Sequence, residues 1–135
     1  MEYVDRNKTL EELEGAIWPH DDFGSHVVLE SQRLRKIPIR DLSVENLRLL
    51  IGQKIGLEFL VPLAIECLMD SPLVSGDYYR GDLMVAVLAI PEEFWTAHPV
   101  LNNQVVEIGF EVVNLYDTIT EQILPAIKRF QFRNE

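Results

Sequence analysis

The sequence contains a single cysteine, Cys67, so no disulfide bond can form within the chain. It also lacks a run of about 18 uninterrupted apolar residues, which a transmembrane helix needs, and its first residues hold no apolar signal-peptide core. Cys67 lies in an apolar stretch that is typical of a buried helix, so we expect it to pack rather than to react. Together these absences predict a protein of the reducing cytoplasm.

Sequence motifs of catalysis are also missing. The chain has no Gly-x-Ser-x-Gly element, and Gly52-Gln-Lys-Ile-Gly56 lacks the spacing and the Lys-Ser/Thr ending of a phosphate-binding loop. His98 precedes Pro99 at a predicted helix junction, where a capping or surface role is expected. The abundance of carboxylates is not evidence for a catalytic pair, because any fold of this composition assembles some. We therefore expect no catalytic residue, no cofactor and no enzymatic activity.

One arrangement could still bind a metal ion. His26 and Glu30 are four residues apart on a predicted helix, so their side chains share a face, and His20, Asp21 and Asp22 lie shortly before them. A small metal-dependent enzyme that uses His26 and Glu30 is thus an alternative function. Pairs of this spacing are frequent in ordinary helices, and we predict no metal site.

Basic residues are scarce: 12 lysines and arginines stand against 22 acidic residues, for a net charge of −10. This charge disfavours direct binding to nucleic acid or to an anionic membrane, and it attracts a basic protein. The charge is uneven, with net values of −6 in residues 1–30, +4 in 31–54, −10 in 55–127 and +2 in 128–135. Solubility alone does not require such a distribution, so we favour an acidic surface with a binding role.

No alternation of period two extends beyond a few residues, and the length fits one domain, residues 1–135. Thr9 with Glu12 forms a predicted capping box, and Ser25 and Ser43 are further predicted N-caps. The pattern predicts an all-α fold: a compact bundle of about six to seven helices with a long C-terminal helix or helix pair. Residues 37–40 and 85–90 could instead be short strands, although the flanking caps favour turn and helix.

Two prolines leave the assignment of helix boundaries undecided in the sequence. Pro62 falls within the apolar stretch 57–69, which is either one central helix or a turn followed by a new helix. Pro125 falls in the last helical region, which is either one helix kinked near Gln122 or two helices in near register. An apolar stripe runs through that last region, formed by Leu101, Val105, Ile108, Val112, Leu115, Ile119, Ile123, Ile127 and Phe130. We expect it to pack on the core; a dimer seam, and hence a dimeric adaptor subunit, is the alternative.

The segment from Gly76 to Asp82 combines two tyrosines, one arginine and two aspartates between glycines. Tyrosine and arginine are enriched where protein interfaces carry their binding energy, so we predict a recognition loop. Alternatively, Tyr78 and Tyr79 pack against the core beside Trp95. The predicted contacts with a protein partner are acids expected to be exposed on loops and helix starts, together with one tyrosine: Asp21, Asp22, Asp77, Tyr78, Asp82, Glu92 and Glu93.

Several motifs resemble those of immunity proteins from bacterial contact-dependent growth inhibition (CDI) systems, over about residues 9–95. The most specific is Ile51-Gly-Gln-Lys-Ile-Gly-Leu-Glu-Phe-Leu-Val-Pro-Leu-Ala-Ile65, followed by Gly76-Asp-Tyr-Tyr-Arg-Gly-Asp-Leu83. Similar motifs are Thr9-Leu-Glu-Glu-Leu-Glu-Gly15, the run from Leu34 to Arg48, and Phe94-Trp95. Such proteins usually have proline where this chain has Arg80.

The resemblance implies a toxin–immunity function. A CDI immunity protein acts in the cytoplasm, where it binds the C-terminal toxin domain of a large surface protein delivered by a neighbouring cell. Many such toxins are nucleases, and their polyanionic substrate favours a basic cleft that an acidic partner can cover. The implied partner is thus a basic toxin domain, with a ribonuclease favoured, bound one-to-one at its active or substrate-binding cleft. Residues that contact the toxin vary within such families, so the motifs do not identify them.

Overall fold

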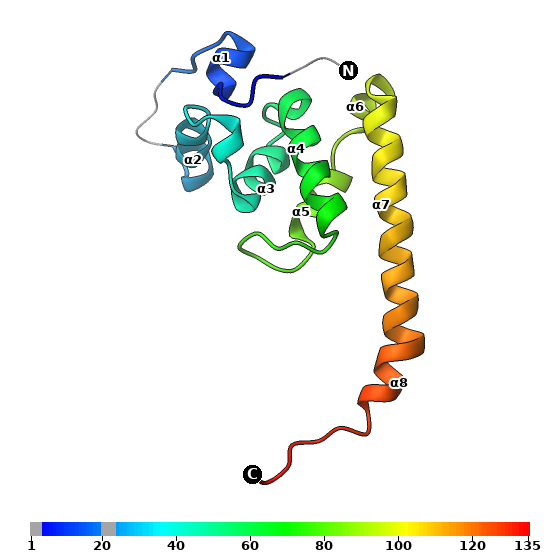
Figure 1. Ribbon diagram of the computed structural model, residues 1–135. Coiled ribbons are helices and arrows are strands. Elements are labelled where there is room, and N and C mark those ends of the chain that lie inside the picture. The colour runs from blue at the N-terminus through cyan, green and yellow to red at the C-terminus, as the bar shows by residue number, and fades with distance from the viewer. Residues whose placement is uncertain (1–3, 20–23) are drawn as a thin grey trace.

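The computed structural model describes residues 4–19 and 24–135, and these residues are helical or irregular (Figure 1). The order of elements is α1 (Leu10–Glu14), α2 (His26–Leu34), η1 (Ile39–Asp41), α3 (Val44–Gly52), α4 (Leu57–Asp70), α5 (Asp82–Leu88), α6 (Glu92–Ala97), α7 (Pro99–Thr118), η2 (Ile119–Ile123) and α8 (Leu124–Ile127). The all-α prediction, with a long C-terminal helix, is therefore confirmed.

The core forms around α4, which packs against α3, α5 and α7. Its inward residues are buried aliphatic side chains: Leu60, Val61, Ala64, Ile65 and Leu68. Leu50 and Leu83 meet them from α3 and α5. Gly56 precedes α4 with φ +63°, and a Cβ there would lie 2.7 Å from a methyl carbon of the buried Leu10. Only glycine both adopts this left-handed backbone conformation easily and leaves room for the Leu10 side chain. Gly56 therefore allows α1 to pack closely against the start of the central helix.

Local capping chemistry determines where the first helices begin. Thr9 and Glu12 form both hydrogen bonds of the predicted capping box, and Gly15 ends α1 in the left-handed conformation. The hydroxyls of Ser25 and Ser43 accept hydrogen bonds from backbone N–H groups in the first turns of α2 and α3. These predicted starts are confirmed, because caps depend on a few adjacent residues rather than on tertiary packing.

The open alternatives near prolines and apolar stretches are also resolved. Pro62 lies inside the continuous helix α4, so the interpretation as a separate turn and new helix is wrong. Residues 39–41 form a 3₁₀ turn and 82–88 form α5, so the strand alternatives are wrong as well. Within the described residues, β-type pairing is limited to the isolated bridges Thr9–Pro38 and Ser75–Arg80.

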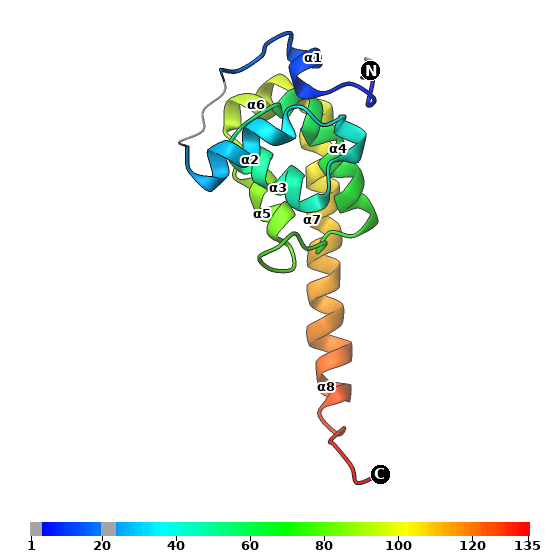
Figure 2. The same cartoon turned by 90° about the vertical axis from the view of Figure 1, so that its left-hand side faces the viewer.

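The last helix leaves the body of the protein. Figures 1 and 2 show α7 running along the other helices and then projecting well beyond them, together with α8. A π-helical turn, η2, separates the two, near the predicted kink at Gln122. Pro125 explains the turn, because it has no N–H to donate to the carbonyl of Glu121. None of the helices in the described part of the chain has the length and hydropathy needed to cross a bilayer.

The expectation that the whole C-terminal stripe packs on the core is only half correct. Ile108 is buried, and Leu101 and Val105 pack against the core. Beyond them Ile119 and Ile123 are exposed, because no other helix lies beside this part of the chain. The residues from Phe110 to Phe130 are named the arm below; all of them are exposed or only half-buried. The described residues before the arm, 4–19 and 24–109, are named the head.

One arginine is completely buried at the N-terminal side of the head. Arg35 follows α2 and is 0 % exposed. Its guanidinium donates to the carboxylate of Glu14 at 3.1 Å and to the carbonyl of Ala16 at 3.2 Å. It also lies 4.0 Å from the centre of the Trp18 ring. Arg35 therefore attaches the segment after α1 to α2.

Candidate functional site

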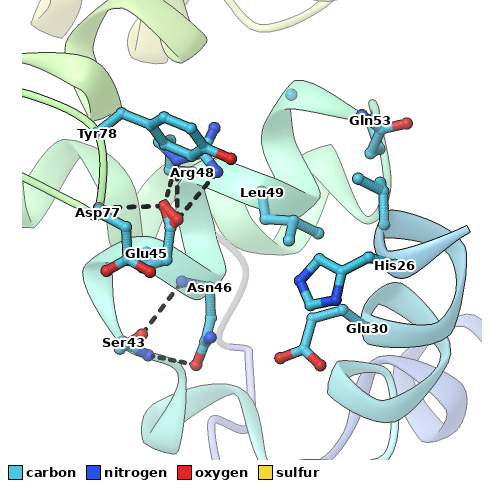
Figure 3. Close-up of a pocket in the computed structure, with 12 residues that line it drawn as sticks. His26, Glu30, Ser43, Glu45, Asn46, Arg48, Leu49, Gln53, Asp77 and Tyr78 are labelled. Carbon is cyan, nitrogen blue, oxygen red and sulfur yellow. Dashed lines mark hydrogen bonds and ion pairs between the residues drawn. The ribbon is translucent and has the colours of Figure 1, made fainter.

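A cleft of about 410 Å³ opens between α2, α3 and the loop 71–81 (Figure 3). Side chains of mixed polarity line it, from His26, Val27, Glu30, Ser43, Glu45, Asn46, Arg48, Leu49, Gly52, Gln53, Asp77 and Tyr78. In Figures 1 and 2, α2 and α3 lie on the side of the head opposite α7. The cleft thus brings together Asp77 and Tyr78, predicted as partner contacts, with His26 and Glu30, predicted as an alternative metal pair.

The metal pair is poorly supported by the geometry. Glu30 accepts two hydrogen bonds from Arg33, at 2.5 and 3.0 Å, and these bonds hold the pKa of Glu30 below its usual value. Its carboxylate is therefore engaged with its own helix. Among residues 4–19 and 24–135, no group of three or more His, Cys, Asp or Glu side chains is placed to hold a metal ion. His20, Asp21 and Asp22 lie outside the described residues.

The loop of the cleft presents its aromatic side chains to solvent. Tyr78 is 72 % exposed and Tyr79 is 54 % exposed, so the alternative in which they pack against the core is wrong. Trp95 instead donates from its indole nitrogen to the carbonyl of Ile90, and it packs edge-to-face with Phe94. The guanidinium carbon of Arg48 lies 4.4 Å from the centre of the Tyr78 ring, and this cation–π contact holds the ring in place from one face.

Asp82 holds this loop from inside. Its carboxylate accepts hydrogen bonds from the backbone N–H groups of Gly76 at 2.6 Å, Tyr78 at 3.1 Å and Tyr79 at 3.4 Å. Asp82 was predicted as an exposed contact and as an N-cap. It is instead only 3 % exposed, and it is the first residue of α5, whose N-cap is Gly81. The prediction of exposure is wrong because the glycine-flanked loop folds back over the carboxylate. Asp82 therefore fixes the backbone conformation of the loop and is not part of its exposed surface.

Glu45 and Arg48 are the site residues that the sequence analysis missed. Glu45 is ion-paired with Arg48 through the guanidinium Nε and an η nitrogen, and it also accepts from the backbone N–H of Asp77 at 3.3 Å. Arg48 Nε lies 4.0 Å from the Asp82 carboxylate. Their spacing of three on a predicted helix was the available signal, but an i,i+3 pair of this kind is common on solvent-facing helices.

The hydrogen bonds to Asp82 predict a pH-dependent stability. Burial raises the pKa of Asp82, but the backbone N–H groups that donate to its carboxylate outweigh this effect and hold the pKa below its ordinary value of about 3.9. The ionised carboxylate thus stabilises the fold fully above pH ~3.9, and this stabilisation is lost as the pH falls through the lowered native pKa. We expect Asp82→Asn to lower the free energy of unfolding by about 2 kcal/mol at pH 7.

Urea unfolding of both proteins between pH 7 and pH 3 tests this expectation. The difference in unfolding free energy between wild type and Asp82→Asn should narrow below pH ~3.9. Asp77→Asn is the matched control, since Asp77 lies in the same loop but is exposed; it should change stability by less than about 0.5 kcal/mol. A constant difference between wild type and Asp82→Asn at every pH would contradict the role given to the carboxylate.

The remaining predicted residues are dispersed. Glu92 and Glu93 are exposed in the first turn of α6, which lies at the opposite end of the head from the loop of Tyr78 in both ribbon views. Cys67 is half-buried, and burial raises the pKa of its thiol, which disfavours the reactive thiolate. His98 connects α6 to α7 and contacts the carbonyl of Phe94 through Nδ1 at 2.8 Å, as expected for a capping residue.

Comparison with known proteins places the chain in a family. No curated protein and no solved structure matches it. The model of one family, described as CDI immunity proteins, matches residues 12–105. This match extends from α1 into α7 and therefore includes the whole cleft, while the whole arm lies outside it. Because the match covers well over half of the chain, this protein belongs to the family of CDI immunity proteins.

Proposed function

We propose that this protein binds and neutralises the cognate C-terminal toxin domain of a CDI system in the cytoplasm, without catalysis. The family match carries the proposal. The proposed toxin is a basic nuclease, with a ribonuclease favoured, and the complex contains one copy of each protein. Binding covers the active or substrate-binding cleft of the toxin.

The proposed toxin-facing surface is the cleft together with the loop 76–81. Tyr78 is its anchor, since its ring is largely exposed and is held in place by Arg48. The backbone behind the ring is fixed by Asp82, so little conformational entropy is lost when a partner covers it. Tyrosine is enriched among the residues that contribute most to interface affinity, which favours Tyr78 as such a contact. Asp77, exposed at the same edge, adds a charge at the rim.

Electrostatic attraction arises from the whole chain rather than from the cleft alone. Two cleft carboxylates are already paired with arginines, Glu30 with Arg33 and Glu45 with Arg48. The net charge of −10 is therefore the main source of the field that a basic toxin meets at a distance. Such a field raises the rate of encounter, while contacts such as that of Tyr78 determine how long the complex persists.

The direct test uses the reading frame upstream of the gene for this chain. Its C-terminal domain is produced alone and together with the full immunity chain, in cells whose growth is followed. We expect the domain alone to stop growth, co-production to restore it, and the two proteins to elute together with a one-to-one mass. Growth arrest that persists despite co-production, with no complex formed, would contradict the proposal.

Salt is expected to slow association. Raising the ionic strength from about 0.05 M to about 0.5 M shortens the screening length from roughly 14 Å to roughly 4 Å. We therefore expect the association rate constant to fall about tenfold or more, with little change in the dissociation rate constant. Surface plasmon resonance at several salt concentrations gives both constants. An association rate that is insensitive to salt would refute electrostatic steering even if binding were retained.

A further inference from the structure

The carboxylates of the cleft outnumber its basic groups. Three acids, Glu30, Glu45 and Asp77, line the concavity with one arginine, Arg48, so the lining carries a net charge of −2 when His26 is neutral. Figure 3 shows the carboxylate of Glu30, from α2, across the cleft from those of Glu45 and Asp77. A positive group that enters is therefore attracted from both walls. Charge complementarity favours a basic side chain of the partner over an acidic one.

Glu30 is the acid of this set that can accept a new partner inside the cleft. Its side chain is 23 % exposed. Each of its two oxygens accepts one hydrogen bond from Arg33 and retains a second lone pair. Glu45 has less capacity, because it already accepts bonds from Arg48 and from the backbone N–H of Asp77. The Asp77 carboxylate has no bonded partner among the described residues, but it is exposed at the rim.

The surface beside Glu30 suits a long basic side chain. Leu49 lies between the two walls in Figure 3 and offers apolar surface to methylene groups. The amide oxygen of Asn46 accepts one bond, from the backbone N–H of Ser43, and retains a lone pair for a second donor. The N-terminus of α3, which would favour an anion, is already capped by Ser43 and Asn46. These groups accept hydrogen bonds or pack against methylenes, as a lysine or arginine requires.

We propose that one lysine or arginine side chain of the toxin domain enters the cleft, packs its methylene groups along Leu49 and donates to the carboxylate of Glu30. This contact belongs to the proposed toxin-binding function and depends on it. The cleft volume of about 410 Å³ lies in the range of roughly 300–1,000 Å³ that encloses a whole small ligand, so a side chain can enter instead of lying across the opening. Asp77 at the rim attracts the same basic segment during approach.

Replacing Glu30 with glutamine tests the contact through the dissociation rate. Once the toxin covers the cleft, the pair is shielded from water, and loss of a shielded charge pair mainly speeds dissociation. We expect the dissociation rate constant of the Glu30→Gln complex to rise about tenfold in surface plasmon resonance with the toxin domain. The matched control is Glu111→Gln, which removes one negative charge from the exposed surface of the arm and should change that constant less than about twofold.

The two possible failures are distinguishable. Equal dissociation rate constants for Glu30→Gln and Glu111→Gln would overturn the contact but leave the proposed function intact, since the wild-type complex still forms. A wild-type chain that binds no toxin would contradict the proposed function, and the contact with it. Circular dichroism should show both variants folded, because Glu30 pairs with the exposed Arg33 and Glu111 is itself exposed.

Arg33→Ala separates a direct role of Glu30 from an indirect one. If Glu30 acted only by stabilising α2 through Arg33, both substitutions would weaken toxin binding alike. If its carboxylate binds the basic group of the toxin, Arg33→Ala frees both oxygens for that group, and dissociation should be unchanged or slower. Faster dissociation of Arg33→Ala, by the factor seen for Glu30→Gln, would exclude the direct contact.

A double-mutant cycle identifies the toxin residue. Each lysine and arginine of the toxin domain is replaced by methionine, and the affinity of each variant is measured against wild type and against Glu30→Gln. For one toxin residue, the two substitutions together should weaken binding at least about tenfold less than the product of their separate effects, because either one alone already breaks the same contact. The residue type at that position shows whether lysine or arginine is used. Independent effects at every basic position would overturn the proposal.

Discussion

Replacing Tyr78 with alanine should lower the affinity for the toxin domain about 100-fold, which corresponds to about 2.7 kcal/mol. The ring is 72 % exposed in the free protein, so its apolar surface is available to a partner without any rearrangement of the core. Arg48 lies against one face of the ring, and Asp82 fixes the backbone N–H of Tyr78. Truncation therefore removes a preorganised contact rather than a mobile one, and most of the loss should appear as faster dissociation.

The matched control is Tyr116→Ala. Tyr116 is similarly exposed, at 65 %, but it lies on the arm, away from the cleft. Isothermal titration calorimetry with the toxin domain should show the loss for Tyr78→Ala and less than a threefold change, about 0.6 kcal/mol, for Tyr116→Ala. Both variants should melt at nearly the wild-type temperature because neither ring is buried. The reverse result, in which only Tyr116→Ala lowers the affinity for the toxin domain, would show that the toxin binds the arm and not the cleft.

The second large effect is on stability. We expect Arg35→Ala to lower the free energy of unfolding by about 3 kcal/mol. The substitution leaves a cavity where a fully buried side chain stood, and it deprives the carbonyl of Ala16 and the carboxylate of Glu14 of their donor. It also removes the partner of the Trp18 ring. The segment that follows α1 should then detach before the rest of the head unfolds.

Arg33→Ala provides the comparison for this prediction. Arg33 is on the same helix and pairs with Glu30, but its side chain is 57 % exposed. A surface pair of this kind contributes little, so the loss should be below about 0.5 kcal/mol. Urea unfolding followed by circular dichroism gives both values. Equal losses of unfolding free energy for Arg35→Ala and Arg33→Ala would show that the buried arginine contributes no more to stability than the exposed one.

The features predicted correctly from the sequence are those that short segments determine by themselves. Thr9, Ser25 and Ser43 begin helices because each side chain reaches only to the third residue ahead. The sequence also predicts an irregularity near Gln122, as a kink or a helix break, and the structure has a π-turn there; it is local too, since Pro125 removes one specific hydrogen bond. These outcomes need no knowledge of how the helices pack.

The features that were missed depend on contacts between distant segments. Asp82 has the pattern of an N-cap, and nothing local shows that the loop before it folds back over the carboxylate. Glu45 joins that network from a helix more than thirty residues away in the sequence. The periodic stripe of the last helix could not show where the head ends, because apolar spacing is the same for a side chain that meets a core and for one that meets solvent.

The buried carboxylate of Asp82 fixes the backbone conformation of the loop independently of the side chains that the loop exposes. Asp82 and Glu45 hold residues 76–79 by their backbone N–H groups, and a backbone N–H is the same for every residue type except proline. The exposed side chains at positions 77–80 can therefore be exchanged without altering the bonds that form the loop. Where this loop contacts the toxin, as proposed above, substitutions at its surface can follow changes in the toxin, while Asp82 and the glycines beside it keep the backbone conformation.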